Sequence, residues 1–144
     1  MGKKVTIPLK ESKPQNQKKI DIVRRPMRYD RLSFNFSFLT SDKNYNLEKL
    51  ESSHQKKLLK KMKTLSSDHV TRVKLLRKEQ GFEFIEILKK SITISEFVSS
   101  GRFDECDSKY CIFRISDSGR VIGKIYNNLF YVLAIDTRFD LYDH

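Results

Sequence analysis

The chain has 144 residues, of which 38% are hydrophobic, and its 29 Lys and Arg outnumber its 18 Asp and Glu to give a formal net charge of +11. This length suits a single domain whose core needs neither a metal nor a disulfide. No apolar run approaches the roughly 18 residues of a membrane-spanning helix, and the first residues lack the apolar stretch of a secretory signal. We therefore expect a cytoplasmic protein with no membrane partner.

The positive charge is concentrated in the first part of the chain. Residues 1–28 have a net charge of +7 and residues 41–80 one of +6, whereas residues 81–144 have a net charge of −2. Clustered Lys and Arg neutralise phosphates and release counterions, so this distribution favours a nucleic-acid partner, with solubility alone as the alternative. Because all three prolines lie within residues 1–28 among polar side chains, we expect a flexible basic tail there and a single α+β domain over residues 29–144.

The first elements of this domain show clear periodicity. Residues 31–39 alternate apolar and polar side chains, which predicts a strand. Asn44 or Asn46 can then cap a helix whose apolar stripe, in steps of three and four, runs from Leu47 to Leu65. A second helix follows a short polar break and stops before Gly81. Together these helices predict a two-helix hairpin.

Both predicted helices carry basic side chains away from their apolar faces. Four lysines of the first helix form a stripe about half a turn from the apolar one. Lys124, in the middle of a later strand, is a further basic candidate. The candidate nucleic-acid-binding residues are Lys49, Lys56, Lys60, Lys63, Arg72, Arg77, Lys78 and Lys124.

The last third of the chain has the pattern of three consecutive strands. Residues 110–115, 120–126 and 129–136 are apolar and β-branched, and polar turn residues separate them. Residues 82–108 fit either a strand or a buried connection and remain undetermined. The predicted fold is α+β: an N-terminal strand, a two-helix hairpin, and a C-terminal antiparallel β-meander packed on the helices.

The cysteines and histidines do not form a metal-binding pattern. Cys106 and Cys111 are four residues apart, while His54, His69 and His144 lie far from them and from one another. A zinc site needs four ligands at matched spacing, and no glycine-rich phosphate loop is present either. We expect two free thiols, with Cys111 in the core, and neither a metal nor a cofactor.

The order of elements and several segments of the meander resemble the RelE/ParE superfamily of small bacterial toxins. The residues that carry the resemblance are Phe113–Ile115, Asp117–Gly119, Arg120–Ile122, Tyr131–Ile135, Arg138 and Tyr142. The chain departs from the family at Asp136 and Thr137, where members usually show a Gly-His pair, and in the greater length of residues 82–108.

The resemblance implies an activity and a partner. The RelE branch consists of metal-independent endoribonucleases that cut mRNA on the ribosome, whereas the ParE branch acts on gyrase. RNA cleavage without a metal needs cations near the phosphate and a proton donor for the leaving oxygen. Arg114, Arg120 and Arg138 are the candidate cations, and Tyr142 and His144 the candidate proton donors. The implied partners are RNA, in preference to DNA, and a small acidic antitoxin protein.

Two other functions stay open at this stage. The chain could be a non-enzymatic basic nucleic-acid-binding module of a mobile element, with the sheet as scaffold. It could also be a protein-interaction domain that uses its acidic C-terminal third. The candidate arginines also have purely structural interpretations: Arg114 could pair with Asp117 or Glu105, and Arg138 with Asp140.

Three carboxylates near the candidate catalytic residues oppose phosphate binding there. Asp136, Asp140 and Asp143 all follow the last predicted strand. A carboxylate repels a phosphate at short range, so free carboxylates at these positions would weaken an anion site.

Overall fold

The structure, a computed structural model, describes residues 30–143. The predicted tail over residues 1–28 and the candidate residue His144 lie outside the described residues. Along the chain the elements are β1 (Ser33–Asn35), α2 (Ser52–Ser66), α3 (Val70–Leu75), β2 (Glu83–Ile85), α4 (Ser95–Ser99), α5 (Arg102–Glu105), β3 (Tyr110–Ser116), β4 (Gly119–Tyr126) and β5 (Leu129–Asp136). The predicted α+β class is confirmed.

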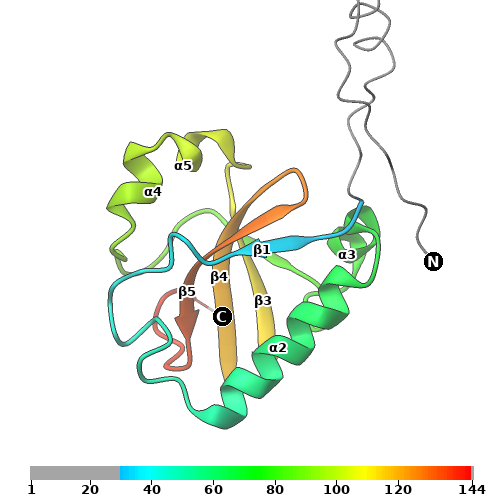
Figure 1. The fold of residues 1–144 in the computed structure, drawn as a ribbon, viewed down its shortest axis with the longest axis horizontal. Helices are drawn as coiled ribbons and strands as arrows, with labels where there is room; N and C mark the ends of the chain where they lie inside the picture. Colours follow the sequence, from blue (N-terminus) through cyan, green and yellow to red (C-terminus); the bar gives the residue numbers. More distant parts are fainter. Residues whose placement is uncertain (1–29, 144) are drawn as a thin grey trace, which may run out of the picture.

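A five-stranded sheet in the order β1-β5-β4-β3-β2 organises the described part of the chain. β1 runs parallel to β5, and all other neighbours are antiparallel (Figure 1). The predicted C-terminal meander is confirmed, since β3, β4 and β5 follow the predicted strands closely. Asn127 takes a φ of 56° in the turn between β4 and β5, a left-handed conformation that Asn tolerates and tight hairpins require.

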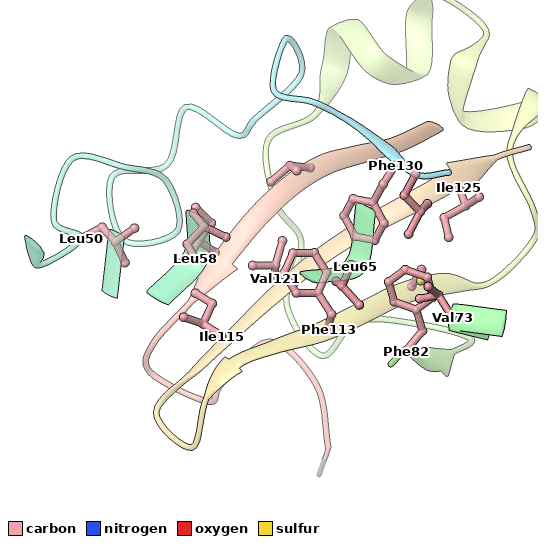
Figure 2. Close-up of a cluster of buried hydrophobic side chains, with 14 residues drawn as sticks. Leu50, Leu58, Leu65, Val73, Phe82, Phe113, Ile115, Val121, Ile125 and Phe130 are labelled. Carbon is pink, nitrogen blue, oxygen red and sulfur yellow. The ribbon is translucent and has the colours of Figure 1, made fainter. Parts of the chain in front are cut away.

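α2 and α3 cover one face of the sheet. Leu58 and Leu65 of α2 and Val73 of α3 lie against Phe113 and Val121 of the strands (Figure 2). Each of these five side chains is buried. The helices therefore bury the apolar stripes that the sequence predicts, and the predicted packing of the meander on the helices is confirmed.

The predicted start of the first helix is wrong. α2 begins at Ser52, and Asn46 instead holds a turn, because its side chain accepts a hydrogen bond from Glu48 N and donates one to Thr40 O. Asn side chains bond the backbone of turns as readily as they cap helices. Leu47, which the periodicity placed on the buried stripe, is 46% exposed.

Two other predicted elements are shorter in the structure. The N-terminal strand ends at Asn35, whose side chain accepts a hydrogen bond from Ser37 N and turns the chain out of the sheet. α3 ends at Leu75 rather than near Gly81. A Cβ atom at Gly81 would lie only 2.6 Å from the carbonyl oxygen of Val73. The glycine therefore allows the backbone after α3 to pass close to that helix.

The second face of the sheet is covered without a long helix. Phe38 and Tyr45 of the loop after β1, the helices α4 and α5, and the C-terminal residues 137–143 lie over it. The undetermined residues 82–108 contribute β2 at the sheet edge and then both short helices. β4 and β5 are buried on both faces, as the nearly continuous apolar sequence of β5 predicts.

Candidate functional site

A basic surface runs along the solvent side of α2. We define the basic helix face as Lys56, Lys57, Lys60 and Lys63, which are all exposed. None of these four ammonium groups forms an ion pair with a carboxylate of residues 30–143. Their charge is available to an external anion, and Lys57, which was not among the predicted residues, lies beside the predicted stripe.

The other predicted nucleic-acid-binding residues outside the strands differ in whether a neighbouring side chain pairs with them. Arg72 of α3 lies 3.8 Å from Asp68, and Lys49 donates a hydrogen bond to Asn44 Oδ1 at 2.9 Å. Arg77 and Lys78, in the turn after α3, are exposed and form no ion pair with any residue of 30–143. They extend the free positive charge from α2 toward β2.

Two predicted catalytic residues meet in the sheet. Arg114 of β3 and Arg120 of β4 are direct cross-strand partners, which we call the arginine pair. Arg120 is only 7% exposed, and its Nη1 donates to the carbonyl oxygens of Ser116 and Gly119, both at 2.9 Å. Its guanidinium carbon lies 5.0 Å from the centre of the Phe139 ring.

The arginine pair forms no close ion pair within the described residues, although the carboxylate of Glu79 interacts with Arg114 at longer range. No carboxylate of residues 30–143 lies within 4.0 Å of either guanidinium, and the buried Nε atoms of both lack a hydrogen-bond acceptor. A buried donor without an acceptor costs about 1–3 kcal/mol, and like charges in cross-strand positions are destabilising. An oxyanion beside Arg114 would offset the repulsion between the two guanidinium groups, which makes the pair a candidate anion site.

Tyr142 approaches the same cluster from the C-terminal segment. It is 2% exposed, and its hydroxyl donates to Glu83 Oε1 at 3.4 Å. Burial and the charge of Glu83 raise the pKa of Tyr142, while Arg120 and Arg114 act in the opposite direction. The phenol is therefore protonated at neutral pH and holds a proton beside the arginine pair.

Lys61 of α2 lies near the arginine pair. It is half-buried, and its Nζ donates to Gln80 O at 2.9 Å. Burial, together with the positive charge of Arg114, lowers the pKa of Lys61. The arginine pair and the helix that carries the basic helix face are therefore close enough to interact electrostatically.

Arg138 belongs to a different cluster. Its Nε lies 3.5 Å from Asp140 Oδ2, so the pairing left open by the sequence is present. Asp140 also accepts hydrogen bonds from Tyr45 at 2.7 Å and Lys90 at 2.9 Å. This network binds the C-terminal segment to residues 45 and 90, and Arg138 is not part of the arginine pair.

Lys124 does not belong to the basic surface. It is 2% exposed within β4, and its Nζ donates to Ser108 O at 3.2 Å. No group of three or more potential ligands for a metal occurs within residues 30–143, and no helix there is long and apolar enough to cross a membrane.

The fold and site thus define an α+β protein with a basic helix face and an arginine pair that forms no close ion pair with residues 30–143. No protein-family model, curated protein or solved structure matches the chain.

Proposed function

We propose that the protein binds RNA. The phosphate backbone lies along the basic helix face, and one phosphate approaches the arginine pair from the side of Arg114 and Lys61. The observation that carries this proposal is the arginine pair itself, in which two adjacent guanidinium groups have no carboxylate partner among residues 30–143. A guanidinium holds a phosphate through paired hydrogen bonds, which suits it to this role.

The free lysines of α2 support the same proposal. Four exposed ammonium groups on one helix, none paired within the described residues, attract a polyanion by releasing its counterions. The preference for RNA over DNA rests on the resemblance to the RelE branch. In that setting the protein would also have an acidic antitoxin protein as a partner.

A second candidate function is metal-independent cleavage of mRNA, as in the RelE-like endoribonucleases, which act on the ribosome. The observation that favours it is the position of Tyr142, whose protonated hydroxyl lies in the same cluster as Arg120. The arginine pair would stabilise the charge that develops on the phosphate, and the phenol would supply the proton to the leaving oxygen. Access to Tyr142 would require the C-terminal segment to move, since the side chain is buried.

Binding is tested by fluorescence anisotropy with a labelled single-stranded RNA over a range of salt concentrations. We expect the double variant Lys56→Glu with Lys60→Glu to bind at least about tenfold more weakly, and the salt slope to fall by about 0.7 for each phosphate that the protein no longer neutralises. The matched control is Lys43→Glu with Lys109→Glu, which makes the same change in net charge away from α2. Equal weakening in both double variants would contradict a specific basic helix face.

The arginine pair and the cleavage step need separate measurements. Arg114→Gln should weaken RNA binding, whereas Tyr142→Phe should leave binding intact and abolish cleavage of an end-labelled transcript. Binding by the wild type without any cleavage would leave the RNA-binding module and refute the ribonuclease. RNA binding that is unchanged in Arg114→Gln would refute the role of the arginine pair.

A further inference from the structure

A groove of about 560 Å³ opens on the face of the sheet opposite α2. It lies between residues 86–94 and the helices α4 and α5, and its size is within the range of small-molecule sites. The side chains that matter for its chemistry are Ile92, Ile94, Val98, Phe103, Ser108 and Tyr110. Most of this wall is apolar or aromatic.

The buried ammonium of Lys124 lies directly behind this wall. Its Nζ is 3.9 Å from the centre of the Phe103 ring and 5.3 Å from that of Tyr110, and it donates to Ser108 O at 3.2 Å. All three of these residues line the groove. The wall of the groove therefore contains the aromatic rings and the carbonyl group that hold a desolvated cation.

Lys124 is under-compensated by its own surroundings. An ammonium has three N–H donors, and Ser108 O is its single hydrogen-bond acceptor among residues 30–143. No carboxylate of these residues lies within 4.0 Å, although Asp104 and Asp107 act on it at longer range. Burial lowers the pKa of Lys124 despite these charges. An anion close to Nζ would offset the cost of burying this charge.

The remaining charges of the groove are already partnered. Lys89 and Lys90 line it and pair with Asp143 at 3.0 Å and Asp140 at 2.9 Å. Glu86, which also lines the groove, lies 3.6 Å from Lys109. The distinctive charge of the groove is therefore the cation behind its wall.

We propose that this groove binds a small amphipathic carboxylate, with its apolar body against Ile92, Ile94 and Val98. Its carboxylate lies beside Ser108, where it acts electrostatically on Lys124 Nζ through the wall. The apolar body gains free energy from burial, and the head group offsets the charge of the buried ammonium. The groove is separate from the basic helix face of the proposed RNA binding, because α2 and the groove are on opposite faces of the sheet.

The test is isothermal titration calorimetry with decanoate, decanol and decylammonium, each below its aggregation concentration. We expect decanoate to bind the wild type at least about tenfold more tightly than decanol, and decylammonium to bind least. Lys124→Met keeps the length of the side chain but removes the charge, so decanoate and decanol should bind it equally. Val98→Trp, at a position that is 51% exposed, should fill the groove and weaken both ligands.

Several outcomes would overturn the proposal. They are equal binding of decanoate and decanol to the wild type, no binding of either ligand, and an undiminished preference for decanoate in Lys124→Met. If Lys124→Met fails to fold, the wild type labelled with ¹³C at lysine Cε replaces it. Decanoate should then shift the Lys124 resonance more than those of the exposed lysines, and a spectrum in which Lys124 is unaffected refutes the site.

Discussion

Asp136 is the residue whose substitution should most strongly disturb the C-terminal segment. Its carboxylate is fully buried at the end of β5 and accepts four backbone hydrogen bonds. Oδ1 accepts from the N–H groups of Arg138 and Phe139, both at 2.9 Å, and Oδ2 accepts from those of Asp140 at 3.2 Å and Leu141 at 3.1 Å. In Asp136→Asn one oxygen becomes an NH₂ group, which would face two N–H donors. Since a buried unpaired donor costs about 1–3 kcal/mol, we expect a decrease of about 2 to 6 kcal/mol in the free energy of unfolding.

The assay is urea denaturation followed by far-UV circular dichroism, because the chain contains no Trp. Asp143→Asn is the matched control. Its carboxylate is 86% exposed and forms an ion pair with Lys89 at 3.0 Å, so its removal should change the free energy of unfolding by less than about 1 kcal/mol. If Asp136→Asn unfolds at the same urea concentration as Asp143→Asn, the carboxylate does not organise this segment and the reasoning is refuted.

Three further substitutions or reactions test the core. Gly123→Ala should cost about 2 to 3 kcal/mol in urea denaturation, because its Cβ would overlap the Phe130 ring and the carbonyl oxygen of Tyr131; a cost below about 1 kcal/mol would contradict this close approach. Burial raises the pKa of Cys106 to about 11, so its reaction with Ellman's reagent at pH 8 should be about 100-fold slower than that of an exposed thiol, unless the protein is unfolded. Burial raises the pKa of Tyr142, so in an absorbance titration Tyr142→Phe should remove one phenol that ionises at higher pH than an exposed tyrosine. Loss of a phenol that ionises in the ordinary range would contradict its burial.

The C-terminal meander was predictable because local and tertiary preferences agree there. β3, β4 and β5 are rich in apolar and β-branched residues, and the turns between them hold small polar residues and Asn127. The beginning of α2 was not predictable in the same way. Asn46 is suited both to a helix cap and to a turn, and its bond to Thr40 O, which decides between them, depends on how the preceding loop folds.

The sequence predicted which residues form the candidate site better than it predicted how they lie relative to one another. Arg114 and Arg120 were predicted separately, and it is the tight turn between β3 and β4 that makes them direct partners. Lys124 was predicted as a nucleic-acid-binding residue, whereas its side chain is buried. β4 lies between two other strands under layers on both faces, so nothing local to Lys124 indicates its burial. Glu83 was missed because residues 82–108 have no decisive periodicity.

The acidic residues that follow β5 do not oppose an anion at the arginine pair in the way that the sequence suggests. The carboxylate of Asp136 is engaged by four backbone N–H groups, and that of Asp143 by Lys89. Burial alone would raise the pKa of Asp140, but hydrogen bonds from Lys90 and Tyr45 outweigh it and hold the pKa below its usual value.

These carboxylates therefore hold residues 137–143 in place across the sheet. In that segment the backbone of Phe139 has a left-handed φ of 59°, and its ring lies against the guanidinium of Arg120. A non-glycine residue in this conformation is strained, and the hydrogen bonds to Asp136 hold it there. The C-terminal segment thus covers Arg120 with the Phe139 ring, while its own carboxylates are engaged by other groups, and Arg114 is the more accessible member of the arginine pair.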